Sequence, residues 1–160
     1  MGEAGSGGRK LLIVGAHSGD FVWRAAGAIA AATSGGGEAK VVAFSYGERG
    51  ESGDLRARLL VSGAGVASAF ETIKPPDLLY FEPHQPELCG FQPNTFVDIT
   101  GVFERKLKAM EAMAAQKYMH KHYAERAEHR AFHARYATGD GGVRYAEAFQ
   151  RAIPQVVRSL

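Results

Sequence analysis

Residues 11–30, LLIVGAHSGDFVWRAAGAIA, constrain the fold more than any other part of the chain. The apolar run over residues 11–14 ends in Gly15 and Ala16, which is typical of a buried strand that reaches a tight turn. Apolar residues then recur at helical spacing over residues 21–30. A strand, a polar turn and a helix form the opening unit of an α/β fold. Because ligands of such folds bind beyond the carboxyl ends of the strands, this turn is a candidate site.

The composition predicts one globular domain over residues 1–160, with a flexible tail at residues 1–9. A net charge of +2, spread along the chain, argues against nucleic acid as a partner. No apolar run is long enough to span a membrane, and the first ten residues hold no signal peptide. A single cysteine, Cys89, excludes an internal disulfide framework and a cysteine-based zinc site. We therefore expect a cytoplasmic protein.

The rest of the chain alternates between strand and helix signals. The pattern predicts a strand over 40–46 that runs parallel to the first, because a strand–helix–strand unit is expected to be parallel. Thr100 is expected to cap a helix over 102–116. Residues 55–70 give no clear element. The remaining predicted elements are strands at 77–82 and 95–100, a helix over 118–136 and a short helix at 145–150.

The loop at residues 47–54 is expected to emerge at the same sheet edge as His17 and Asp20. It carries Glu48, Arg49 and Glu51 among glycines. One interpretation is a solvated turn, and the other is a flexible loop that lays carboxylates over a site. Arg49 in this loop and Arg24 in the preceding helical stretch can each bind a substrate carboxylate.

Histidines provide further candidates. His84 lies between Pro83 and Pro86, which restrict the backbone, and it is either a general acid or base or a surface turn residue. His129 and His133 have a spacing compatible with a metal, but Arg130 stands between them, which favours a solvated helix instead.

His17 and Asp20 offer one nitrogen and one oxygen donor, both of which suit Zn²⁺ or another divalent metal. A catalytic zinc normally has three protein ligands, and the residues themselves supply only these two. The alternative is that Asp20 or Ser18 caps the helix while His17 lines the turn.

Several blocks of this sequence resemble a known family. VGAHSGD followed by a helix resembles the start of the PIG-L/LmbE superfamily of zinc-dependent de-N-acetylases. SYGERGES, FEPHQPELC, TFVDIT, KLKAMEAMAAQ and YAEAFQ, in this order, are similar to its 4-oxalomesaconate hydratase branch. That branch adds water to an unsaturated dicarboxylic acid in the degradation of aromatic compounds. The resemblance covers residues 11–55 and 67–160.

The resemblance implies an α/β, Rossmann-like fold, with a mostly parallel sheet and flanking helices. It implies that His17 and Asp20 are metal ligands. Gly19 stands where the deacetylases have a general-base aspartate, so the resemblance favours the hydratase. Acid–base work then falls on Glu51 and His84, with Glu48 in reserve, while Arg24 and Arg49 bind substrate carboxylates.

One departure from the family concerns the middle of the chain. The superfamily takes its third metal ligand from a central histidine motif, and residues 52–70 contain no histidine. The sequence there indicates an internal deletion near residues 55–62, which truncates the fold. Three functions stay open: an impaired metal-dependent hydratase acting on a small carboxylate, a de-N-acetylase of an N-acetylglucosamine conjugate, and an inactive remnant that binds a partner or forms a homo-oligomer.

Overall fold

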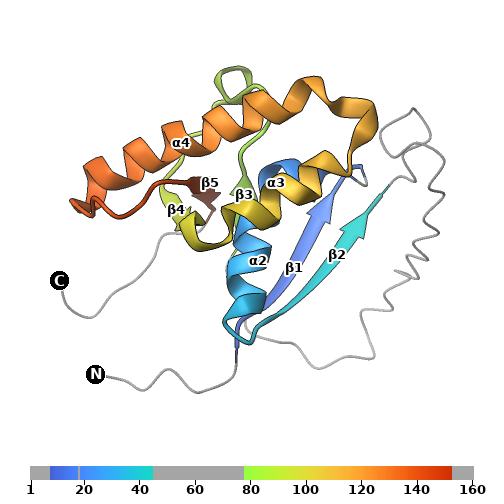
Figure 1. Cartoon of the computed structure of the whole chain (residues 1–160), viewed down its shortest axis with the longest axis horizontal. Helices are drawn as coiled ribbons and strands as arrows, with labels where there is room; N and C mark the ends of the chain where they lie inside the picture. The colour runs from blue at the N-terminus through green and yellow to red at the C-terminus, as the bar shows by residue number, and fades with distance from the viewer. Residues whose placement is uncertain (1–7, 18, 45–77, 153–160) are drawn as a thin grey trace.

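The computed structural model describes residues 8–17, 19–44 and 78–152. Figure 1 shows the helices gathered beside and above two small sheets. The strands are β1 (Lys10–Gly15), β2 (Glu38–Ala43), β3 (Leu79–Phe81), β4 (Thr95–Asp98) and β5 (Ala146–Arg151). The helices are α1 (Asp20–Arg24), α2 (Ala26–Ser34), α3 (Phe103–Glu111) and α4 (Tyr118–Thr138). Three short 3₁₀ turns complete the described part, at Pro86–Cys89, Thr100–Val102 and Ala114–Gln116.

β1 and β2 form a parallel pair, as predicted, with a register that runs from Lys10 opposite Glu38 to Gly15 opposite Ala43. The helical stretch between them is divided into α1 and α2 at Ala25. α2 ends at the glycine run, where Gly36 has a φ of +81°, a conformation that favours glycine. The opening unit is therefore the strand–helix–strand unit that the sequence predicts.

The second sheet, in the order β3–β5–β4, is antiparallel throughout. The described residues thus form a mixed α/β structure, and the expectation of a mostly parallel sheet does not hold for these strands. The predicted helix at residues 145–150 is wrong, because this segment is the central strand β5. Four consecutive β5 residues, from Ala146 to Phe149, are buried, so the alternation that marks a half-exposed strand is missing.

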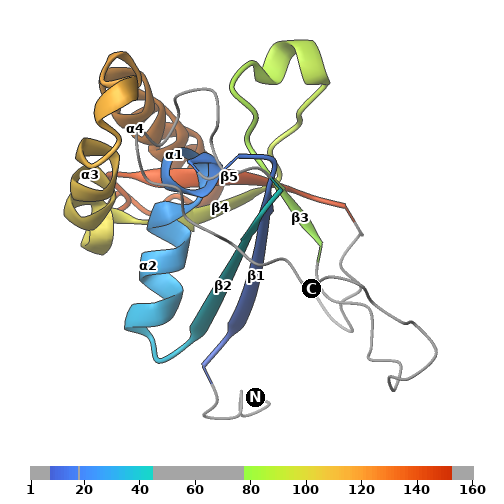
Figure 2. The ribbon, with the colours of Figure 1, turned by 90° about the vertical axis from the view of Figure 1, so that its right-hand side faces the viewer.

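Helix α4 lies across the antiparallel sheet (Figure 2), and its buried face packs on this sheet at Ala131 and Ala134 and on α1 and α3 at Met119 and Tyr123. The prediction of a helix from Tyr118 is confirmed, but the helix is solvated on its outer side only. Because three of the buried residues are alanines, α4 can approach β4 and β5 closely. The buried face consists of Met119, Tyr123, Ala127, Ala131 and Ala134. None of the described helices is long and apolar enough to cross a membrane.

A buried ion pair joins β5 to two helices. The Glu147 carboxylate accepts hydrogen bonds from the backbone N–H groups of Gly27 (2.9 Å) and Ala28 (2.8 Å), and it pairs with Lys106 Nζ at 2.7 Å. A carboxylate at a helix N-terminus satisfies backbone donors and complements the helix dipole. Glu147 therefore fixes α2 and α3 against the sheet.

Thr100 does not cap α3, contrary to the prediction. Its hydroxyl oxygen instead accepts hydrogen bonds from the backbone N–H groups of Arg144 (2.9 Å) and Tyr145 (3.2 Å). The threonine thus anchors the start of β5, an interaction between segments that are distant in the sequence.

Candidate functional site

The turn after β1 brings together His17, Asp20 and Arg24, three residues that the sequence singles out. The backbone N–H of His17 donates to Asp20 Oδ2 at 2.9 Å, and His17 Nδ1 lies 3.6 Å from the same oxygen. Arg24 Nη1 pairs with Asp20 Oδ1, one helical turn further on. His17 is exposed, whereas Asp20 is largely enclosed. Asp20 thus organises the turn.

The turn supplies two of the three donors that a catalytic zinc site needs. Both oxygens of Asp20 already have a partner, His17 on one side and Arg24 on the other. Within residues 8–17, 19–44 and 78–152, no group of three potential metal ligands occurs. This donor set does not fit a complete metal site, and we derive no chemical step through a metal.

Arg24 connects this turn to β3. Its guanidinium lies 5.8 Å from the centre of the Phe81 ring, close enough for a cation–π interaction. Its Nε is buried and has no hydrogen-bond partner among the described residues. A buried, unpartnered donor is costly, so this atom is suited to a water or a polar ligand group.

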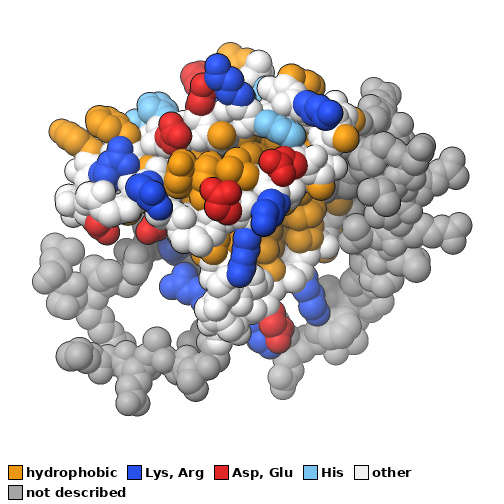
Figure 3. Space-filling model, viewed as in Figure 1, with side chains coloured by type: hydrophobic (Ala, Val, Ile, Leu, Met, Phe, Trp, Pro, Cys, Tyr) orange, Lys and Arg blue, Asp and Glu red, His pale blue; other side chains and the backbone are white. Residues whose placement is uncertain are grey.

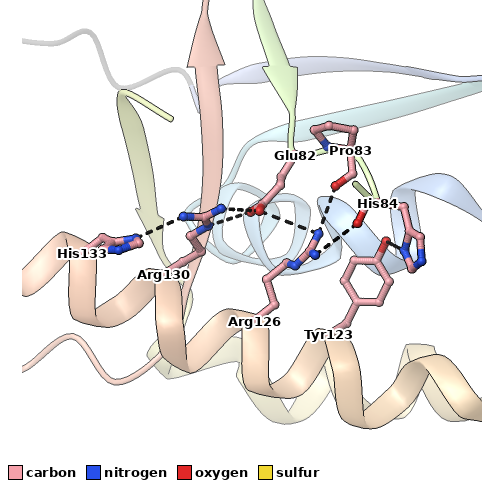
Figure 4. A network of polar contacts seen from close by, with 7 residues as sticks. All are labelled: Glu82, Pro83, His84, Tyr123, Arg126, Arg130 and His133. Atoms are coloured by element: carbon pink, nitrogen blue, oxygen red, sulfur yellow. Dashed lines mark hydrogen bonds and ion pairs between the residues drawn. The ribbon is translucent and has the colours of Figure 1, made fainter. Parts of the chain in front are cut away.

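A network of charged side chains lies where β3 ends, opposite α4 (Figure 4). The Glu82 carboxylate, with a residue exposure of 5%, accepts a hydrogen bond from Arg130 Nε at 2.9 Å and pairs with Arg130 Nη2. Arg126 Nη1 lies 3.7 Å from the same carboxylate. Two arginines thus neutralise one buried glutamate, as a buried charge requires.

Arg126 also holds the turn that carries His84. Its Nη1 donates to the carbonyl oxygen of Pro83 at 3.0 Å, and its Nη2 donates to that of His84 at 3.1 Å. The His84 side chain is exposed, and its Nδ1 lies 3.4 Å from the hydroxyl oxygen of Tyr123 (Figure 4). The predicted rigid turn therefore exists, but α4 contributes to it as well as the prolines.

Two histidines of α4, His122 and His133, have lowered pKa values, which favours their neutral forms. Burial lowers the pKa of His122, and the nearby Arg126 guanidinium lowers it further; the His122 ring centre is 5.1 Å from that of His84. Burial also lowers the pKa of His133, assisted by His129 and Arg130. Arg130 Nη1 lies 3.1 Å from His133 Nδ1.

A small cavity lies inside this region. Arg24, Glu82, Arg126 and Arg130 line it, together with the Lys106–Glu147 pair and neighbouring apolar residues. Its volume of about 20 Å³ accommodates roughly one water molecule. A dicarboxylic acid is far larger, so this cavity is not a substrate pocket.

His17, Asp20, Arg24 and His84 are candidates from the sequence, whereas the residues that surround them in the structure were not candidates. Glu82, Tyr123 and Arg126 were not predicted for the site, and Arg130 entered only as an argument against a metal on α4. Their signal is present in the spacing of residues 123, 126 and 130, which share one helix face. The predicted residues Glu48, Arg49 and Glu51 lie outside the described residues.

On the face of the molecule shown in Figure 3, basic and acidic side chains of the described residues are interspersed, with apolar side chains between them.

Comparison with known proteins relates the chain to hydratases. It is 26% identical over 238 residues to 4-oxalmesaconate hydratase from Pseudomonas putida KT2440, a match that covers 95% of this chain and 92% of that protein. Among solved structures, it matches the crystal structure of GalB, the 4-carboxy-2-hydroxymuconate hydratase from the same strain. The TM-score is 0.75 at 24% identity, with 95% of this chain and 99% of the other covered. No family model matches the chain. The structural likeness establishes a shared fold.

Proposed function

We propose that this protein is a hydratase that adds water to an unsaturated dicarboxylic acid of the 4-oxalomesaconate type, in the degradation of aromatic compounds. The observation that carries the proposal is the match to a hydratase over nearly the whole of both chains. The site agrees with it, because exposed histidines follow both β1 and β3. We place the chain in the PIG-L/LmbE superfamily, with a Rossmann-like fold, in the cytoplasm.

In the proposed reaction, a base removes a proton from water, oxygen bonds to one carbon of the double bond, and the other carbon receives a proton. Glu51 and His84, with Glu48 in reserve, are the groups assigned to this acid–base work. Arg24 and Arg49 bind the carboxylates of the substrate. The cavity beside Glu82 is too small for a dicarboxylate, and we place the substrate on the exposed side of His17 and His84, the proposed site residues.

His17 and Asp20 are the proposed donors for Zn²⁺ or another divalent metal. We attribute the incomplete donor set to an internal deletion near residues 55–62. The alignment with the hydratase extends over 238 residues, whereas this chain has 160, so at least 78 positions of that alignment have no counterpart here. This difference in length supports the deletion and an impaired activity.

Gly19 favours the hydratase over the de-N-acetylase. A Cβ atom at this position would lie 2.5 Å from the terminal methyl group of Met113, so a larger side chain needs Met113 to move. The place of the deacetylase base is therefore occupied by an apolar side chain.

The test is the hydration of 4-oxalomesaconate, followed by the loss of its ultraviolet absorbance, with zinc added. We expect slow turnover by the wild type. Absence of turnover by a folded, zinc-loaded sample would reject the proposal and favour an inactive remnant, whose oligomeric state then becomes the next question. Release of acetate from an N-acetylglucosamine conjugate would reassign the protein to the deacetylases. Metal content, compared with that of His17→Ala, tests the proposed donors.

A further inference from the structure

We infer that Tyr123 and Arg126 position His84 so that its neutral ring carries its proton on Nε2 and acts as a hydrogen-bond donor to the substrate. The inference rests on the proposed hydratase function. It replaces the acid–base role proposed above for His84 by the stabilisation of developing negative charge, and it leaves the movement of protons to a glutamate. Tyr123 and Arg126 are positioning residues, since they act through His84.

The backbone at His84 is held by a fixed fork. The two terminal nitrogens of Arg126 donate to two successive carbonyl oxygens, those of Pro83 and His84, at 3.0 and 3.1 Å. The planar guanidinium makes such a bidentate contact with little further loss of freedom. Arg126 is itself attracted by the buried Glu82 at 3.7 Å, which is also held by Arg130. The position of the turn is thereby tied to the core.

The His84 ring is approached by a rigid hydroxyl group. Tyr123 is only 3% exposed and stacks on Trp23 with 5.5 Å between ring centres. Trp23 is fixed in turn by a hydrogen bond of 2.8 Å from its Nε1 to Gln116. The Tyr123 hydroxyl therefore has a defined position, 3.4 Å from His84 Nδ1. This contact is long, and such contacts often shorten when substrate binds.

The direction of this hydrogen bond follows from the charges nearby. The Arg126 guanidinium lies 5.5 Å from the centre of the Tyr123 ring, and a cation there makes the phenol a better donor than acceptor. With the hydroxyl donating, Nδ1 of His84 must be an unprotonated acceptor, so the proton of the neutral ring lies on Nε2. This second nitrogen belongs to a side chain that is exposed among the described residues, where it can face a substrate.

This tautomer limits what His84 can do. A neutral imidazole whose Nε2 carries the proton cannot accept a proton there, but it can donate a hydrogen bond to an oxygen that gains negative charge. When water adds to a double bond conjugated with a carbonyl or carboxyl group, that oxygen gains the charge. A glutamate then takes the proton from water and passes it to the neighbouring carbon, so the atoms balance without proton transfer at His84.

The experiment is a long-range ¹H–¹⁵N correlation spectrum of the histidine side chains in the whole protein, recorded where His84 is neutral. The His84 signals are assigned by their loss in His84→Asn. We expect the wild type to show the Nε2–H tautomer alone, and Tyr123→Phe to show a mixture of both tautomers. Tyr136→Phe, the same change at an exposed site on the same helix, serves as the control and leaves the spectrum unchanged.

Two results would overturn the inference: a wild-type His84 with its proton on Nδ1, or a spectrum that Tyr123→Phe does not alter. Neither requires turnover, so failure of the hydratase proposal is recognised separately. In an active enzyme, Tyr123→Phe is expected to lower kcat by about 10-fold, the effect of one lost hydrogen bond, with KM nearly unchanged. A change confined to KM would contradict the assigned role.

Discussion

Two buried glutamates, each paired with basic side chains, have different roles in this molecule. Glu147 and Glu82 are 4% and 5% exposed, and each is paired with basic side chains of a helix. The partners of Glu147, Lys106 and the N-terminus of α2, are packed in the interior. The arginines at Glu82 have donors to spare, and those of Arg126 reach the turn that exposes His84.

The basic partner, rather than the buried carboxylate itself, determines the role of each glutamate. Lys106 brings one compact ammonium group to Glu147, and among the described residues this group hydrogen-bonds to the carboxylate alone. Arginine presents several donors in a plane, so Arg126 approaches Glu82 on one side and binds two carbonyl oxygens on the other. The Glu147–Lys106 pair therefore stabilises the fold. Glu82, through Arg126, fixes the position of the turn that carries His84.

The largest expected effect concerns the interior pair. Glu147→Ala leaves Lys106 buried without a counter-charge and α2 without its carboxylate, so we expect the free energy of unfolding to fall by about 3–5 kcal/mol. Urea denaturation measures this change. The matched control is Glu38→Ala, which removes the exposed Lys10–Glu38 pair and should cost at most about 1 kcal/mol. Equal effects of the two variants would remove the distinction between buried and exposed pairs.

A smaller effect is expected where α2 meets the sheet. A Cβ atom at Gly27 would lie 2.7 Å from Ile99 Cγ2, so Gly27→Ala should destabilise the fold by about 1–3 kcal/mol through overpacking. Gly101→Ala, at a position with open space around it, is the control for the change itself. Thermal denaturation distinguishes them, and a Gly27→Ala protein as stable as the wild type would show that this contact is loose.

The arginine fork at His84 is expected to affect turnover more than stability. In Arg126→Lys the charge near Glu82 remains, but one ammonium group cannot replace two donors in a plane. We expect kcat to fall by about 10-fold, equivalent to about 1.4 kcal/mol, while the urea midpoint changes little. A loss of stability in proportion to the loss of turnover would make Arg126 a structural residue only.

The smallest expected effect depends on pH. Because the pKa values of His122 and His133 are lowered in the folded protein, protonation favours the unfolded chain. Their contribution is fully present above the unfolded pKa of about 6.5 and is lost as the pH falls through the lowered folded values. In the double variant His122→Gln/His133→Gln, we expect the free energy of unfolding to fall less steeply as the pH is lowered below about 6.5. Urea denaturation at a series of pH values measures this slope. An unchanged slope would contradict the lowered pKa values.

The sequence was most informative where local patterns decide the structure. The apolar run of β1, the glycines after α2 and the long α4 were predicted close to their observed positions, because periodicity and glycine are local signals. β5 was predicted as a helix, since its alanine and glutamate residues favour helices and only its neighbours, β3 and β4, make it a strand.

The candidate site was predicted only in part, for a related reason. His17, Asp20 and His84 follow strands and could be placed from the sequence. Glu82 was not recognised as a site residue, since its value depends on Arg126 and Arg130, more than forty positions further along the chain. Such long-range pairs leave no local periodicity.

The most direct test of the account is turnover per folded molecule in Glu82→Gln and Glu147→Gln, measured as hydration of 4-oxalomesaconate beside the folded fraction of each sample. We predict that Glu82→Gln loses turnover by at least about 10-fold beyond its loss of folded protein. Glu147→Gln should lose turnover only as far as it unfolds. Equal losses that follow the folded fraction in both variants, or no turnover in the wild type, would contradict the account.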